Sequence, residues 1–337
     1  MKTKPILLVL IEVAAGLALC TTMFAAQPAP SASSTAILAA EAWAFPVPPS
    51  PPKLNAAKID PHKVFHLAGS NRTYTNGQIS LSNPPDWFPQ DHPLMPQIVA
   101  HGRKPAWACG FCHLPNGEGE PASASLMGLP KAYILEQLVS FRDGERGASL
   151  PRNTQDMANE AHGLTESDMQ LAAEYFSQLK FIPHVHVVET STVPATGWKD
   201  WVLVPNKSSA PQPIGERIIE IPGNVHDYEY RSDRVSYVAY APLGSIARGA
   251  VIAAKGDGSA AACESCHGTE LEGANLPDIG IAPPLAGRSP TYIVRELILF
   301  CTGKRSDPAA APMRAEASQL TIPQMIDVAA YAASRKP

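Results

Sequence analysis

The feature that most constrains this chain is an internal repeat built around the motif Cys-x-x-Cys-His. The first copy is Cys109, Cys112 and His113, and the second is Cys263, Cys266 and His267. Downstream, LMGLPKAYILEQLVSFRDGER matches LAGRSPTYIVRELILFCTGKR, and MANEAHGLTESDMQLAAEYF matches MRAEASQLTIPQMIDVAAYA. Self-similarity in a fixed order indicates one structural unit present twice. We therefore predict two modules, at residues 91–182 and 242–337.

Each module is predicted to be mainly helical. Apolar residues recur at helical spacing in Ile134, Leu135, Leu138 and Val139, and again in Ile293, Val294, Leu297 and Ile298. The last helix of each module opens with a hydroxyl three residues before a polar side chain, as Thr165 and Asp168 or Thr321 and Gln324, which is typical of a capping box. A short helix is expected before each Cys-x-x-Cys-His. The fold class is therefore mainly α, with two tandem helical domains.

Three chemistries use two cysteines at this spacing: a redox dithiol, half of a zinc site, and covalent attachment of haem with the histidine as iron ligand. A zinc site needs about four nitrogen or sulfur ligands, and each module offers two cysteines and one adjacent histidine. A redox dithiol has no need for a repeated histidine and is expected after a strand. The sequence therefore favours haem attachment at both copies, with zinc and dithiol as alternatives.

A second axial ligand is predicted for each iron. Met157 and Met313 occupy matching positions in loops before the last helix of each module. Met169 and Met325 also repeat, but they fall inside that helix, where methionine more often fills a core. We predict Met157 and Met313 as the ligands and keep the helix pair as the alternative. A thioether raises the iron's reduction potential, and with both axial positions filled the site is expected to transfer electrons.

The regions outside the modules differ from them in composition. Residues 1–26 carry two lysines, an apolar stretch and small residues, which indicates an export signal or an N-terminal anchor. Residues 6–26 are long enough for a membrane tether. Residues 27–90 are predicted to be a proline-rich extension with a hairpin at Asn76-Gly77. Residues 183–241 are β-branched and aromatic, and prolines interrupt them, which predicts a β-rich insert.

Composition narrows the possible partners. The net charge is −4 and no basic run occurs, so nucleic acid is not an expected partner. Arg142, Arg146, Lys304 and Arg305 follow helices of the modules and are expected either to pair with haem propionates or to remain solvated. Cys301 shares a helix face with Leu297 and is predicted to be a core residue, with a reactive or ligating thiol as the alternative.

With these motifs in this order, the chain resembles the dihaem class I c-type cytochromes, particularly the cytochrome c4-like family. The resemblance implies two small helical domains that face each other, two covalently bound haem c groups, and periplasmic electron transfer. It implies thioether bonds at the four cysteines Cys109, Cys112, Cys263 and Cys266. It assigns His113 and His267 as proximal ligands and Met157 and Met313 as distal ligands.

Two departures from the family are visible. The family has a proline before its Leu-x-Gly element, whose carbonyl steadies the proximal histidine. Pro284 matches it, whereas the first copy has Ser125, so a less rigid first haem site is expected. The extension and the insert are also additions, which suggests a docking role.

Three functions follow from this interpretation. The leading one is a periplasmic carrier that is not itself an enzyme and passes single electrons along a respiratory chain. Its partners would be redox proteins, such as a membrane cytochrome complex, an oxidase or a dehydrogenase. The first alternative is a haem c subunit bound tightly to a periplasmic dehydrogenase, and the second is a dihaem peroxidase or thiosulfate-oxidising enzyme.

Overall fold

The computed structural model describes residues 32–45, 60–147, 152–199 and 201–337. The predicted export segment 1–26, including the possible tether, lies outside these residues, as does the proline-rich stretch 46–59. Among the described residues, no helix is both long enough and apolar enough to cross a bilayer.

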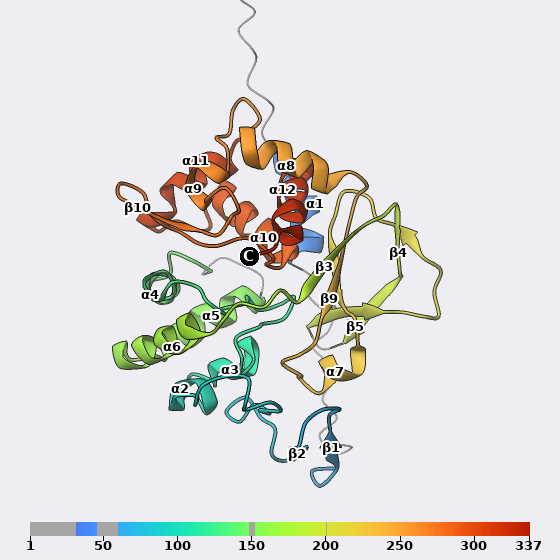
Figure 1. Ribbon diagram of the computed structural model, residues 1–337, viewed down its shortest axis with the longest axis vertical. Helices are drawn as coiled ribbons and strands as arrows, with labels where there is room; N and C mark the ends of the chain where they lie inside the picture. The colour runs from blue at the N-terminus through green and yellow to red at the C-terminus, as the bar shows by residue number, and fades with distance from the viewer. Residues whose placement is uncertain (1–31, 46–59, 148–151, 200) are drawn as a thin grey trace, which may run out of the picture.

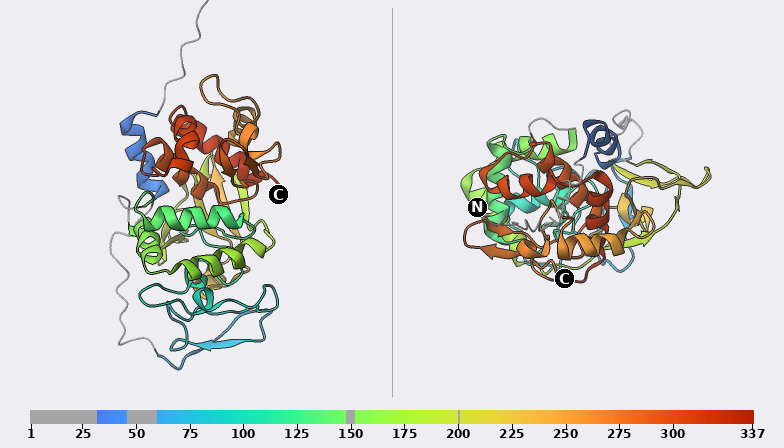
Figure 2. Two further views of the ribbon diagram at one scale, coloured as in Figure 1. Left: turned by 90° about the vertical axis from the view of Figure 1, so that its left-hand side faces the viewer. Right: turned by 90° about the horizontal axis from the view of Figure 1, so that it is seen from above.

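Both modules are helical, as predicted (Figure 1). The first contains α2 (Gln97–Ala100), α3 (Cys109–His113), α4 (Lys131–Arg142), α5 (Arg152–His162) and α6 (Glu166–Gln178). The second contains α8 (Ser245–Lys255), α9 (Glu264–His267), β10 (Ala274–Leu276), β11 (Gly280–Ala282), α10 (Pro290–Cys301), the 3-10 helix η2 (Pro308–Ala310), α11 (Ala311–Ala317) and α12 (Ile322–Ser334). In two views the second module lies at one end of the molecule and the first nearer the middle (Figures 1 and 2).

The predicted capping boxes begin the last helix of both modules. In α6 the Asp168 amide donates to Thr165 Oγ1 at 3.2 Å, and Asp168 Oδ2 accepts from the Thr165 amide at 3.0 Å. In α12 the same reciprocal pair joins Thr321 and Gln324. These bonds satisfy amides that a helix start leaves without partners, so the local sequence fixes where each helix begins.

The insert is β-rich, as predicted. Its elements are β3 (Val185–Glu189), β4 (Thr192–Val193), β5 (Thr196–Lys199), β6 (Val202–Pro205), β7 (Gln212–Pro213), β8 (Ile219–Pro222), α7 (Val225–Glu229) and β9 (Tyr237–Ala241). The main sheet has the order β3-β9-β8, with β3 parallel and β8 antiparallel to β9. Two short antiparallel pairs, β4 with β7 and β5 with β6, complete the insert.

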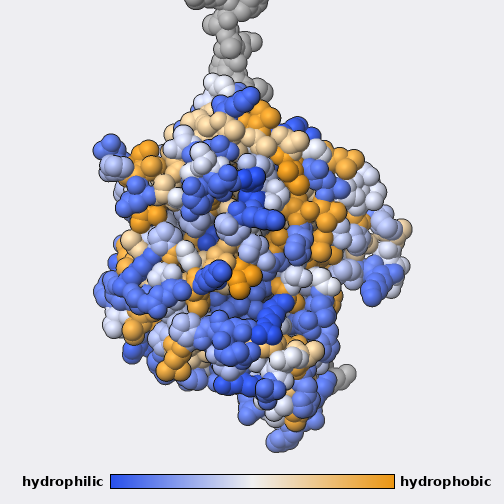
Figure 3. All heavy atoms as spheres, in the orientation of Figure 1, coloured by the Kyte–Doolittle hydropathy of each residue, from blue (hydrophilic) through white to orange (hydrophobic). Residues whose placement is uncertain are grey.

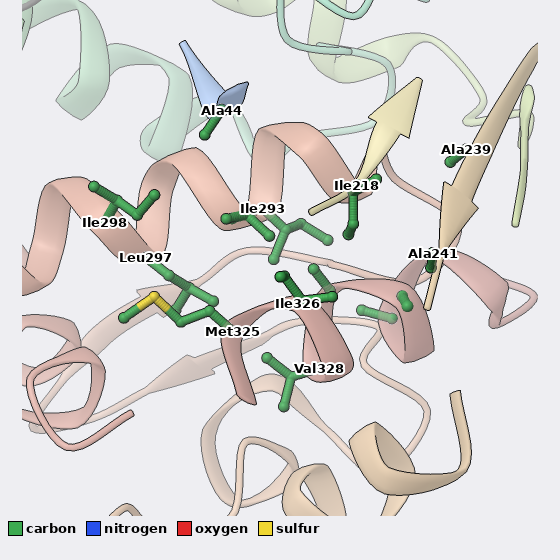
Figure 4. Packing of buried hydrophobic residues seen from close by; sticks show 14 of the residues in the cluster. Ala44, Ile218, Ala239, Ala241, Ile293, Leu297, Ile298, Met325, Ile326 and Val328 are labelled. Carbon is green, nitrogen blue, oxygen red and sulfur yellow. The ribbon is translucent and has the colours of Figure 1, made fainter. Parts of the chain in front are cut away.

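The insert has a small apolar cluster of its own around Val193 and Ile221, and it also shares a larger core with the second module. Ile218 and Ala239 of the insert belong to the same buried apolar cluster as Leu297 and Met325 of the second module (Figure 4). Helix α1 (Ser34–Ala44) adds Ala44 to this cluster. Burial of apolar surface therefore joins the second module, the insert and the first helix of the extension into one folded unit.

The prediction of a hairpin that turns at Asn76-Gly77 is wrong. Strand β2 (Thr73–Thr75) pairs with the preceding strand β1 (Val64–His66), and Asn76-Gly77 comes after this pair. The Gly77 amide donates to Pro61 O at 3.0 Å, and Gly77 is not among the glycines with positive φ. A tight Asn-Gly hairpin requires positive φ at both central residues. The Asn76-Gly77 pair therefore predicted a turn correctly, but not which two strands pair.

Candidate haem sites

We call Cys109–His113 and Cys263–His267 the attachment turns. Each turn places its histidine in the interior, where His113 is 7% exposed and His267 is 5% exposed. His113 Nδ1 lies 2.8 Å from Ala124 O, and His267 Nδ1 lies 2.8 Å from Pro283 O. Because a carbonyl only accepts, Nδ1 carries the proton and Nε2 presents its lone pair, which is the arrangement of a metal-bound histidine. Burial lowers the pKa of both imidazoles and keeps them neutral.

The expected weakness of the first site at Ser125 is not found. The acceptor carbonyl belongs to Ala124 in the first module and to Pro283 in the second, one residue before the Ser125 and Pro284 positions. A backbone carbonyl is present whatever side chain follows it. The two histidines are therefore held by equal hydrogen bonds despite the difference in sequence.

Three of the four cysteines, Cys109, Cys112 and Cys263, have the environment of unreactive thiols. Burial is the main cause that raises the pKa of Cys109 and Cys112 to about 12 and that of Cys263 to about 11. A redox dithiol works as a thiolate, which requires a lowered pKa, so the dithiol alternative is disfavoured. Within the described residues, no group of three or more His, Cys, Asp or Glu side chains is placed to hold a metal ion.

The predicted distal methionines lie in short helices, so their placement in loops is wrong. Met157 is part of α5 and Met313 is part of α11. Both are partly buried, and each borders the apolar cluster that its module's first cysteine also borders, Cys109 for Met157 and Cys263 for Met313. The alternative ligands, Met169 and Met325, are 0% exposed within the cores. The helix pair therefore fills the cores, as expected.

The two modules meet at a buried cluster with approximate two-fold symmetry. Arg146 and Arg305, which align in the repeat, form an antiparallel backbone bridge. Arg146 Nη2 lies 2.7 Å from Glu296 Oε1, and Arg305 Nη1 lies 2.6 Å from Glu296 Oε2. Both guanidinium groups also donate to Gln137 Oε1, which occupies the position matching Glu296. The two arginines are each 4% exposed, so of the two alternatives given for them, solvation is wrong for Arg146 and Arg305.

Two carboxylates face the two arginines of this cluster. Burial alone would raise the pKa of Glu296, but Arg146 and Arg305 beside it hold that pKa below its ordinary value, so the carboxylate is ionised. Asp307 Oδ2 lies 3.9 Å from Arg305 Nε, which is an ion pair but too long for a hydrogen bond. Nε of each arginine is therefore buried without a hydrogen-bond partner, and such unused donors suit a further anion such as a haem propionate.

Sequence reasoning missed the residues that cover the first attachment turn. The Arg231 guanidinium lies over the Phe111 ring, 4.1 Å from its centroid, and pairs with Glu120 at 3.1 Å. Arg231 is in the insert, more than a hundred residues away along the chain, so neither spacing nor repetition could connect it to the turn. A positive φ of 54° at this non-glycine residue is a mark that only the folded chain shows.

Cys301 is placed as predicted. It is partly buried on α10 and packs against the apolar cluster of the second module. Burial raises the pKa of its thiol to about 11, so it is a neutral core residue.

Comparison with known proteins identifies the family. No protein-family model matches the chain. The thiosulfate dehydrogenase electron acceptor of Thiomonas intermedia is 26% identical over 234 residues, which cover 68% of this chain and 79% of that protein. Cytochrome c-554(548) of Halomonas halodenitrificans is 33% identical over 84 residues, which cover 25% of this chain and 96% of that protein. This chain belongs to the c-type cytochromes.

This cytochrome contains the Cys-x-x-Cys-His motif of haem c attachment twice, at Cys109–His113 and at Cys263–His267. Two solved structures are similar to it. Thiosulfate dehydrogenase (TsdBA) from Marichromatium purpuratum has a TM-score of 0.42 and 26% identity, over 68% of this chain and 37% of that longer chain. Cytochrome c4 of Acidithiobacillus ferrooxidans has a TM-score of 0.43 and 23% identity, over 67% of this chain and 98% of that one.

Proposed function

We propose that this cytochrome passes single electrons between a donor and an acceptor protein in the periplasm, as part of a respiratory chain. The observation that carries the proposal is the repetition of one site. Each module has two partly buried cysteines and a neutral histidine, and Nδ1 of the histidine lies 2.8 Å from a backbone carbonyl oxygen. Two such sites in one chain provide two one-electron centres next to each other.

The proposed roles follow the repeat. Cys109 and Cys112 hold one haem and Cys263 and Cys266 the other, in domains 91–182 and 242–337. His113 and His267 are the proximal ligands, and Met157 and Met313 are the distal ligands. The haem iron supplies a centre that changes its oxidation state by one electron.

The chain's own residues determine what such a centre can do. A thioether from Met157 or Met313 is a soft, neutral ligand that favours ferrous iron. With a histidine on one side and a methionine on the other, substrate has no coordination position. A carrier is therefore favoured over a peroxidase or another dihaem enzyme.

Arg146 and Arg305 are proposed to bind propionate groups at the contact between the modules. Their buried Nε groups have no hydrogen-bond partner, although Asp307 Oδ2 lies 3.9 Å from Arg305 Nε. Both haems would then be bound at the surface that the modules share, which favours electron exchange within the molecule.

The ligands are tested by substitution in the full-length protein. His113→Ala and His267→Ala are each expected to reduce the haem content from two to about one and to destabilise that module, because the haem completes the core of a small domain. Met157→Ala and Met313→Ala are expected to keep both haems but to lose one methionine-ligated signal in the absorption and EPR spectra. Met169→Leu and Met325→Leu are the controls and should keep both signals. Full haem content and unchanged spectra in the histidine variants would refute the assignment.

A second candidate function is that of the electron-accepting subunit of a thiosulfate dehydrogenase. It is favoured by the relative from Thiomonas intermedia, because that similarity includes 79% of the relative rather than one haem motif. The test is to mix the oxidised cytochrome with a thiosulfate dehydrogenase and thiosulfate and to follow haem reduction. Fast, saturable reduction and copurification of the two proteins would support this function. Reduction no faster than that of an unrelated c-type cytochrome would count against it.

A further inference from the structure

The two attachment turns differ in what lies over them. The first turn is enclosed by segments that come from outside its module. The Ala108 amide, just before Cys109, donates to Leu81 O of the extension at 3.0 Å. A Cβ at Gly110, between the two cysteines, would lie 3.5 Å from Pro84 Cγ. The extension therefore packs directly on the first turn, and β1 and β2 lie beyond α2 and α3 at the end of the molecule (Figure 1).

The insert encloses the same turn from another side. Arg231 stacks on Phe111 and donates to Phe111 O, and Asn116 Nδ2 donates to Asp233 O at 2.6 Å. The extension and the insert are themselves joined, since Trp87 Nε1 donates to Tyr230 O at 2.7 Å. We call these residues the cover: Leu81, Pro84, Trp87, Phe88, Tyr230, Arg231 and Asp233. Trp87 and Phe88 are each 1% exposed, so the cover has its own packed core.

The second turn has no such cover among the described residues. The hydrogen bonds around it come from its own module: the Ala261 amide donates to Glu316 Oε2 at 2.7 Å, and Ser265 Oγ donates to Ala262 O at 2.6 Å. Ala261 and Ser265 are exposed, whereas Trp107 and Phe111, at the matching positions of the first turn, are half-buried. In Figure 1, α9 and β10 lie at the periphery of the molecule, away from the insert.

The surface around the second turn is acidic. Residues 261–280 contain Glu264, Glu270, Glu272 and Asp278 and no lysine or arginine. Glu270, Glu272 and Asp278 are exposed, and Ile279 beside them is 44% exposed. Figure 3 shows hydrophilic and apolar side chains intermingled over this part of the molecule. In the first module the acids that follow the turn, Glu118 and Glu120, are buried beneath the cover.

We propose that the second attachment turn, with residues 261–280 around it, is the surface on which a redox protein with a lysine- or arginine-rich face docks. The proposal rests on the proposed electron-transfer function and adds the route: electrons are exchanged with this partner through the second module. Thioether bonds hold one edge of each haem against its attachment turn, so whatever covers the turn also controls approach to that edge. The cover blocks this approach at the first turn.

The negative charge of this surface indicates that the docking face of the partner is positively charged. Of the four acids, Glu270 pairs with Arg335, so the negative field comes mainly from Glu264, Glu272 and Asp278, with the apolar Ile279 among them. Such fields accelerate association of an oppositely charged protein, and the acceleration decreases as salt is added. A partner with an acidic docking face would be repelled by the same field.

The test uses the full-length dihaem protein and, as a basic probe, a lysine-rich mitochondrial-type cytochrome c. Electron exchange is followed by stopped-flow absorption at low and high ionic strength, with hexacyanoferrate(III) as an anionic comparison. Asp278→Lys is compared with Glu216→Lys, because both acids are exposed and both substitutions change the charge by the same amount. Asp278→Lys is expected to slow exchange with the basic probe about tenfold at low salt, with a smaller effect at high salt. Glu216→Lys, on the insert, should have little effect.

A second measurement maps the contact without a variant. Carbodiimide cross-linking of the two proteins, read by mass spectrometry, is expected to join probe lysines to Glu264, Glu270, Glu272 or Asp278. Cross-links concentrated on the cover, or equal slowing by Asp278→Lys and Glu216→Lys, would overturn the docking proposal while leaving the carrier function intact. Absence of haem, or of any electron exchange with both probes, would instead refute the carrier function.

Discussion

The two modules have the same backbone conformation at their attachment turns, but different segments of the chain pack around them. After the histidine, each module passes through three residues with positive φ at matching positions: Leu114, Gly117 and Gly119 in the first module, and Gly268, Leu271 and Gly273 in the second. The leucine and the glycine have exchanged places, and the turn is unchanged. Each leucine is 1% exposed, so burial offsets the cost of a conformation that glycine adopts more readily. The site therefore depends on the path of the backbone more than on the residue type at each position.

The surroundings make the modules unequal. The second module shares its core with α1 and the insert, while the first has a smaller core and is enclosed at its attachment turn. The two histidines make equal contacts, whereas different segments pack over the two attachment turns. The added segments therefore change what covers each turn and not how its histidine is held. Four predictions test this comparison.

The largest effect is expected at the contact between the modules, where one carboxylate serves two buried arginines. Glu296→Gln removes that charge and leaves Arg146 and Arg305 poorly compensated in the interior. Breaking a buried ion pair in this way costs about 3–5 kcal/mol, so urea denaturation of the holoprotein should show a large loss of stability. Gln137→Ala is the control, because it removes hydrogen bonds from the same two guanidinium groups without changing the charge of the cluster, and it is expected to cost less stability. Equal losses of stability in the two variants would show that the charge of Glu296 is not what stabilises the cluster.

The next largest loss of stability is expected where α8 packs against α12 in the second module. A Cβ at Gly249 would lie 2.0 Å from Asp327 O of α12, which is far inside van der Waals contact. Gly249→Ala should force α8 away from α12 and destabilise the protein by about 3 kcal/mol, near the upper end for overpacking. Gly197→Ala is the control, because no atom lies within 4 Å of its Cβ position. A thermal unfolding temperature unchanged by Gly249→Ala would show that α8 does not pack as described.

A smaller effect on stability, which depends on pH, is expected at Asp233 in the cover. Burial is the main cause that raises the pKa of Asp233 from 3.8 to about 6, and Asp86 and Asp91 add to it while His92 opposes it. The folded protein therefore holds this proton more firmly than the unfolded chain does. This contribution to stability is full below pH 4 and is lost as the pH rises to about 6.

Asp233→Asn should remove that dependence and leave the protein about 2 kcal/mol more stable than wild type at pH 7. Urea denaturation between pH 4 and pH 7 measures the effect. Parallel curves for the variant and the wild type would show that Asp233 is ionised in the folded protein throughout this range.

The smallest effect is expected where the sequences of the two sites differ most visibly. Ser125→Pro and Pro284→Ser exchange the residues after the acceptor carbonyls. The hydrogen bonds to His113 and His267 come from Ala124 and Pro283, so the two reduction potentials should stay nearly constant. Potentiometric titration measures them. A clear shift confined to the substituted module would show that the proline ring, and not the carbonyl, steadies the histidine.

Part of the fold was predictable because its signals are local or repeated. The capping residues Thr165 and Thr321 act within one helical turn, and the motif at Cys109 and Cys263 was recognisable because it occurs twice. The hairpin prediction failed at Asn76-Gly77 because an Asn-Gly turn does not specify which strand pairs with which. The loop prediction for Met157 and Met313 failed because short helices carry little periodic signal.

The sequence alone determined the chemistry of this cytochrome: two attachment motifs, their histidines, and the helices that carry them, all expressed by residues near one another in the chain. Tertiary structure decided the rest. It placed Glu296 between Arg146 and Arg305, and it brought Arg231 over Phe111 while the second turn stayed open. The contacts of Arg146 with Glu296 and of Arg231 with Phe111 join residues more than a hundred positions apart, and their free energy exists only once the intervening chain has folded. The motifs and their spacing therefore predict the haem sites, and packing decides which attachment turn is covered.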